Sequence, residues 1–162
     1  MMFYNGFVAG ECGGSPCNKQ NERRKTMINI KELSVGNWVK FPHGIEKITN
    51  LPYIEFKGRG GLCAGFAGSS TAFPVSVKYL EPIAITPEIL EKNGWKLGEY
   101  SSATLEIENK IVVLEFYESG TQLRIFQRAE DEDLQILDVK VSGLHQLQNA
   151  LTLCGLDKEI EL

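Results

Sequence analysis

Two short segments of the chain carry residues that both start and stop a helix, and they constrain the fold more than any other feature. In the first segment, Thr86 can accept hydrogen bonds from the free N–H groups of the first turn, and Pro87 has the backbone angle of a first helical residue. Gly94 can adopt the left-handed conformation that ends a helix, and Trp95 then falls where an apolar residue covers the last turn. The sequence therefore predicts a short helix between Thr86 and Gly94.

The same signals predict a second helix, with Ser142 as its N-cap and Gly155 as its terminator. Apolar residues recur along one of its faces, at Leu144, Leu147, Leu151 and Cys154. The opposite face carries His145, Gln146, Gln148 and Asn149. One apolar and one polar face are typical of a helix that lies across a sheet with its polar side in water.

Short runs of strand-forming residues, separated by turn residues, fill the stretch from Leu33 to Tyr79. We expect strands at residues 37–41, 45–49, 53–57 and 74–79, with Pro42-His43-Gly44 as a hairpin turn. So many short strands in so few residues favour a small SH3-like β-barrel or a curled sheet.

The second half of the chain predicts an antiparallel β-meander, with strands at residues 103–108, 111–118, 122–128 and 134–141. The alternating residues 158–162 could add a short edge strand. The fold class is therefore α+β: a small SH3-like barrel or curled sheet, a short helix, and a meander with one C-terminal helix packed across it.

The chain divides into three parts at the level of sequence. Residues 1–26 are expected to be a disordered leader or a non-native N-terminal extension ahead of Met27, because a secretion signal would need a basic start and a longer apolar core. Residues 27–83 form an SH3-like β subdomain in this interpretation. Residues 84–162 form an α+β subdomain with a helix, four strands, a second helix and a short strand.

Charge and composition disfavour several classes of function. Residues 27–162 hold 13 of the 17 basic and 19 of the 21 acidic side chains, so this part of the chain is acidic and poorly suited to binding a nucleic-acid backbone. No apolar run approaches the roughly 20 residues that span a bilayer. The four cysteines are too sparse for a disulfide framework and lack the spacing of a zinc site, which favours a cytoplasmic protein without a metal or another cofactor.

The glycine-rich stretch 57–71 is the most unusual segment. Gly60 and Gly61 would let backbone amides approach a phosphate, and Lys57 and Arg59 could pair with it. The stretch lacks the Gly-Lys-Ser/Thr ending of a P-loop and the third glycine of a dinucleotide fingerprint. A ligand or partner contact and a plain connecting loop both explain this composition.

Other candidate residues give weaker signals. Cys63 could act as a nucleophile with His43 or His145 as its base, but no local signature surrounds it, and we predict no catalytic residue. His145 and Gln146 could contact a ligand or partner from the polar face of the second helix, although such residues are usually solvated. Aromatic residues that could line a peptide groove, or fill the core instead, are Trp38, Phe41, Tyr53, Phe56 and Tyr79.

Three segments, at residues 27–39, 74–90 and 144–149, resemble a group of small proteins abundant in Bacteroidetes genomes, their phages and mobile elements. The resemblance spans residues 27–162 and implies that Met27 is the natural start. The group has no established activity, so the resemblance implies no ligand or catalytic residue. Its members have a shorter stretch before Pro74, which implies that the glycine-rich segment is particular to this chain.

The sequence thus favours a non-enzymatic protein-interaction or accessory module of phage or mobile-element origin, with an unknown protein partner. The alternative is a small nucleotide- or phosphate-binding protein, or an enzyme, that uses residues 57–71.

Overall fold

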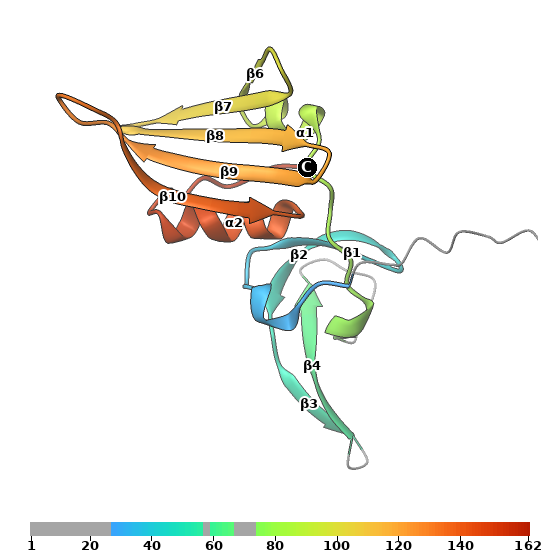
Figure 1. Ribbon diagram of the computed structural model, residues 1–162. Helices are drawn as coiled ribbons and strands as arrows, with labels where there is room; N and C mark the ends of the chain where they lie inside the picture. Colours follow the sequence, from blue (N-terminus) through green and yellow to red (C-terminus); the bar gives the residue numbers. More distant parts are fainter. Residues whose placement is uncertain (1–26, 57–58, 67–73) are drawn as a thin grey trace, which may run out of the picture.

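The computed structural model describes residues 27–56, 59–66 and 74–162, and it shows an α+β protein with two antiparallel sheets (Figure 1). We name residues 27–83 the N-terminal module and residues 84–162 the C-terminal module. Each module has its own apolar core. The predicted leader or extension at residues 1–26 lies outside the described residues, as does the candidate contact residue Lys57.

The N-terminal module is built on one open sheet. Its strands follow the order β1-β2-β4-β3, and β5 also pairs with β4. The elements are η1 (Ile30–Glu32), β1 (Trp38–Phe41), β2 (Gly44–Asn50), β3 (Tyr53–Phe56), β4 (Arg59–Phe66), β5 (Val75–Ser76) and η2 (Val77–Tyr79). The described strands do not close into a barrel, because β1 and β3 stand at opposite ends of this order.

Two expectations for this module are wrong. Most of the glycine-rich stretch is not a connecting loop, because residues 59–66 form strand β4 and pair with three other strands. The predicted strand at residues 74–79 is only two residues long before the chain turns into η2. Val75 and Val77 pack against the core of the module. The strand stays short because only Val75 and Ser76 pair with β4, at Ala64 and Cys63.

The first predicted helix is confirmed, with both of its caps. Helix α1 (Pro87–Lys92) begins after Thr86, whose Oγ1 accepts a hydrogen bond from Ile89 N at 3.4 Å. Gly94 adopts a φ of +79°, and Trp95 N donates to Leu90 O at 3.0 Å. This is the backbone bond that places Trp95 over the end of the helix, where it is buried.

The C-terminal module contains the predicted meander, extended by one strand. The strands are β6 (Lys96–Gly98), β7 (Ser102–Ile107), β8 (Lys110–Tyr117), β9 (Gly120–Gln127) and β10 (Leu134–Val141), in the order β10-β9-β8-β7-β6. Strand β6 was missed because it has three exposed residues and no apolar alternation. The core-facing residues of the three central strands alternate as predicted and are Ala103, Leu105, Val112, Leu114, Leu123 and Ile125.

Helix α2 (Leu144–Leu153) packs across one face of this sheet (Figure 1). The N-cap is Gly143 and not Ser142, whose backbone and hydroxyl instead donate to Gln146 Oε1. A Cβ at Gly143 would lie only 2.8 Å from Pro82 Cβ, so glycine lets the inter-module linker reach the helix. The predicted terminator is confirmed, since Gly155 has a φ of +68° and Leu156 N donates to Leu151 O at 2.9 Å.

The predicted edge strand at residues 158–162 does not form. The side-chain amide of Asn93 takes the place of a neighbouring strand, because its Nδ2 donates to Glu161 O at 2.8 Å and its Oδ1 accepts from Glu161 N at 2.9 Å. Ile160 is buried in the core of the C-terminal module. The chain end is therefore held by side-chain hydrogen bonds from Asn93, from Lys92 to Leu162 O and from Trp38 to Ile160 O, together with the buried Ile160, instead of by a strand ladder.

Candidate functional site

The polar face of α2 is the contact surface between the two modules. Trp38 N donates to Gln148 Oε1 at 2.9 Å, Gln148 Nε2 donates to Gly36 O at 3.1 Å, and Asn149 Nδ2 donates to Glu32 O at 2.6 Å. The expectation that this face lies in water is wrong. Its amide side chains satisfy backbone groups of the N-terminal module, which buried polar groups require.

His145 and Gln146, two of the candidate contact residues, both lie in this junction. His145 is only 1% exposed, and its Nε2 lies 3.5 Å from Glu32 Oε2. Gln146 Nε2 donates to the same carboxylate oxygen at 2.7 Å. Burial lowers the pKa of His145, and the nearby Glu32 carboxylate only partly opposes this effect. Burial therefore favours the neutral form of His145, and the side chain is not accessible to a ligand from solvent.

The lowered pKa of His145 gives a stability prediction. Because the folded state binds the proton less well than the unfolded state, the stabilisation from neutral His145 is complete above about pH 6.5 and decreases as the pH falls through the folded-state pKa. We expect wild type to lose more unfolding free energy than His145→Gln between neutral and mildly acidic pH, measured by urea unfolding. The exposed His43 is present in both proteins and serves as an internal control. Equal losses would contradict the assignment.

A hollow lies beside the junction. It has a volume of about 660 Å³ and is lined by residues 34–37, Lys47, the outer side of α2 and residues 157–160. Lys47 and Glu159 form an ion pair across it. No histidine or cysteine lines this hollow, and the amide side chains of Asn37, Gln148 and Asn149 on its wall already form hydrogen bonds across the junction.

A second feature is a projecting two-stranded ribbon, which we define as β3 together with residues 59–62 of β4. It extends away from the rest of the molecule (Figure 1). Strand β2 pairs with β4 only at Gly65 and Phe66, and β5 pairs only at Cys63 and Ala64. Along the described ribbon, both outer edges are therefore without a further strand.

The glycines of the ribbon determine which side chains are exposed on each of its two faces. A Cβ on Gly60 would overlap the side chain of Tyr53, so glycine lets the tyrosine lie across the neighbouring strand. Tyr53 is nevertheless 69% exposed. On the other face, Ile54 is paired with Gly61, and the space above Gly61 is open. The ribbon thus presents a tyrosine on one face and an isoleucine beside bare backbone on the other.

The structure separates the candidate residues that the sequence suggested. Gly60, Gly61 and the backbone of Arg59 belong to the ribbon, while His145 and Gln146 lie in the junction. Cys63 and His43 line none of the hollows described here. The sequence did not predict that Tyr53 and Ile54 are exposed. Alternation of apolar residues along a strand does not show whether another layer of the protein covers that strand.

The described residues contain no group of three or more His, Cys, Asp or Glu side chains placed to hold a metal ion. No helix in the described part of the chain has the length and apolar character needed to cross a membrane. By its fold, the chain belongs to the structural class of α+β proteins and contains two antiparallel sheets. Comparisons with models of protein families, with curated proteins and with solved structures give no match to this chain.

Proposed function

We propose that this chain is a non-enzymatic protein-interaction module and that the ribbon is its contact surface. The observation that carries the proposal is the ribbon itself, which projects from the body with Tyr53 and Ile54 exposed and with outer edges that no other described strand pairs. A two-stranded ribbon is only marginally stable in water when nothing covers it. Exposed tyrosines are also enriched among the residues that dominate binding energy in interfaces.

The alternative, a phosphate or nucleotide site in residues 57–71, receives less support. A phosphate cradle needs several free N–H groups turned toward one point. Residues 59–66 instead use their backbone in strand pairing, for example between Ile54 and Gly61 and between Tyr53 and Leu62. We therefore rank protein binding above small-ligand binding.

The setting of the proposed function comes from the sequence. The resemblance to proteins of Bacteroidetes, their phages and mobile elements motivates an accessory role in such an element. The cysteines Cys63 and Cys154 are free, as in a cytoplasmic protein.

The proposal is tested by affinity capture with a matched pair of variants. We expect a protein retained by wild type to be reduced by about tenfold or more with Tyr53→Ser/Ile54→Ser, since each is an exposed apolar contact. The control, Leu97→Ser/Tyr100→Ser, removes the same kinds of exposed side chain from the β6–β7 hairpin of the other module. Retained protein is quantified at low and high salt. Equal loss with both variants, or no retained protein at either salt, would contradict the proposal.

A further inference from the structure

Strand β10 forms an open edge of the C-terminal sheet. It pairs only with β9 and stands at the end of the strand order, and no described strand pairs with its outer side. A β-bulge leaves Ile136 without a cross-strand partner. Leu134 is 63% exposed and Ile136 is 40% exposed. A sheet edge that shows apolar side chains and unpaired backbone is a template for an additional strand.

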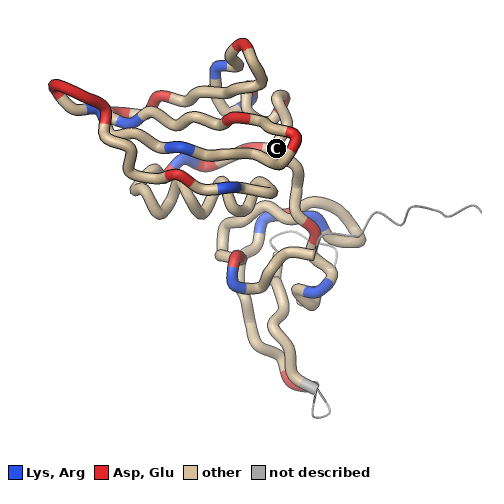
Figure 2. Tube along the Cα trace, in the orientation of Figure 1, with Lys and Arg blue, Asp and Glu red and all other residues tan. Residues whose placement is uncertain are grey.

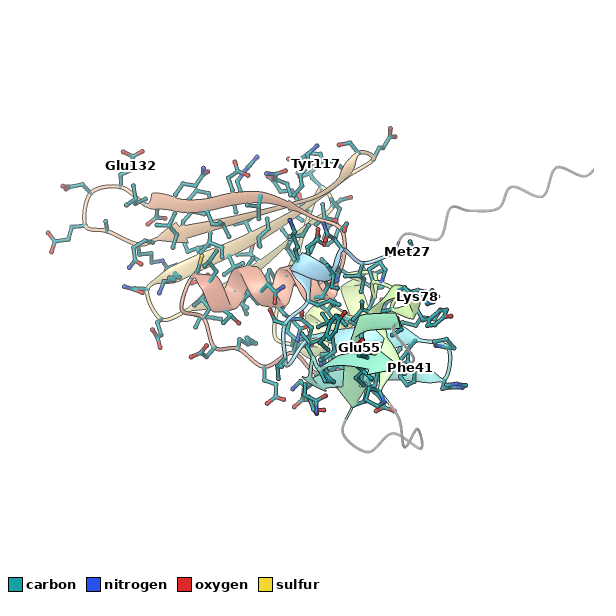
Figure 3. The ribbon with its side chains drawn as sticks, turned by 90° about the horizontal axis from the view of Figure 1, so that it is seen from below. Met27, Phe41, Glu55, Lys78, Tyr117 and Glu132 are labelled. Atoms are coloured by element: carbon teal, nitrogen blue, oxygen red, sulfur yellow. The ribbon has the colours of Figure 1, made fainter. Side chains whose placement is uncertain are left out.

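The loop that leads into β10 holds four consecutive acidic residues, Glu130, Asp131, Glu132 and Asp133 (Figure 2). All four are exposed, and none has an ion pair or hydrogen bond with another described residue. Figure 3 shows Glu132 in this loop, at the end of the sheet away from Tyr117. Four uncompensated carboxylates create a local negative potential that is available to a partner.

Several carboxylates elsewhere on the same sheet have basic partners. Glu106 pairs with Arg128 at 2.7 Å, and Arg124 lies 3.0 Å from Glu115 and 3.7 Å from Asp138. These carboxylates are neutralised on the sheet itself. The four consecutive carboxylates of residues 130–133 therefore form a cluster without basic partners among the described residues, beside the exposed start of β10.

Two neighbouring features add to this charge. Arg128 N donates to Asn109 O at 2.7 Å, which holds the β7–β8 turn and its residue Glu108 at the same end of the sheet. Glu108 and Asp157 line a hollow of about 510 Å³ at the C-terminal end of α2, although Lys158 lines it too. The C-terminal end of a helix carries partial negative charge. A basic side chain is therefore the complementary group for this end of the molecule.

We propose that β10 and residues 130–133 together bind an extended segment of a protein partner that alternates apolar and basic side chains. The segment adds as a strand along β10, its apolar side chains cover Leu134 and Ile136, and its Lys or Arg side chains face the acidic loop. Main-chain hydrogen bonds supply affinity in this mode, and alternate side chains supply specificity. A second copy of the chain is a poorer occupant, because its β10 offers only Lys140 as a basic residue.

Fluorescence anisotropy with a synthetic peptide of alternating valine and lysine tests this surface, which is separate from the ribbon. At low salt we expect E130Q/D131N/E132Q/D133N to weaken binding by about tenfold or more, because close complementary charges dominate there. The matched control E88Q/E91Q/E99Q/E118Q removes the same net charge from exposed sites elsewhere and should change the affinity by less than about twofold. Tyr53→Ser should bind the peptide like wild type.

Strand addition is tested separately from charge attraction. A peptide of the same charge with prolines in place of its central valines cannot complete a ladder, so we expect it to bind at least about tenfold more weakly. Hydrogen exchange should slow at β10 backbone amides when the valine–lysine peptide is present. Absence of binding, equal affinity of both peptides, equal effects of the two charge variants, or protection of β10 by self-association before peptide is added would each overturn the proposal.

Discussion

Leu147→Ala is expected to lower the free energy of unfolding by about 3 kcal/mol, measured by urea denaturation. Leu147 lies on α2 and is fully buried against the C-terminal sheet. The substitution removes buried apolar surface and leaves a cavity, and both effects add to the cost. Because the α2 contact also holds the N-terminal module through the helix's polar face, weaker packing of the helix should loosen the junction as well.

The matched control is Leu153→Ala, which makes the same chemical change at the last residue of the helix. Leu153 is 78% exposed, so the loss should stay within about 0.5 kcal/mol. A similar loss for both variants would mean that α2 does not pack on the sheet with the face described here.

The helices were predictable because their signals are local. Thr86, Pro87 and Gly94 act within a few residues of their own positions, and the structure uses each of them as the sequence indicates. The meander was predictable for a similar reason, since alternation within each strand already marks the buried face. Interactions between neighbours in sequence therefore determined the correctly predicted elements.

Strand β4 could not be recognised in this way, because its stability depends on distant neighbours. Glycine has low strand propensity, but Gly60 and Gly65 leave room for Tyr53 and Asn50 of other strands. Without the pairing register, the sequence shows only an unusually glycine-rich stretch. Gly60 and Gly61 were noticed as unusual, and Tyr53 was named as a residue that could line a peptide groove or fill the core. Its exposure on a projecting ribbon could not be inferred from the sequence.

The polar face of α2 was misinterpreted for a related reason. Amide side chains on a helix face are normally solvated, and the sequence does not reveal that Gly36, Trp38 and Glu32 present matching backbone groups. Helix amphipathicity predicts which face is apolar, but it does not predict whether the polar face meets water or another part of the protein. The acidic loop shows the same limit, because its four carboxylates are evident in the sequence whereas the open edge beside them is not.

Asn37→Ala is expected to cost about 2 kcal/mol of unfolding free energy, because it leaves buried polar groups without partners. Asn37 is buried, its Oδ1 accepts from Ser34 N at 2.8 Å, and its Nδ2 donates to Asn149 Oδ1 at 2.9 Å. The first bond shapes the loop before β1, and the second joins the two modules. Urea unfolding measures the loss, and hydrogen exchange at residues 36–38 should report the loosened junction.

A double-mutant cycle separates these two roles. If the hydrogen bond between Asn37 and Asn149 couples the modules, Asn37→Ala/Asn149→Ala should cost less than the sum of the single changes, by about 1 kcal/mol. Asn109→Ala, at an exposed turn residue whose side chain makes no hydrogen bond with a described residue, should cost about 0.5 kcal/mol or less and be additive with either change. Strict additivity of Asn37 and Asn149 would show that the two modules associate without this bond, and the junction would then depend on Gln148, Glu32 and the burial of Trp38.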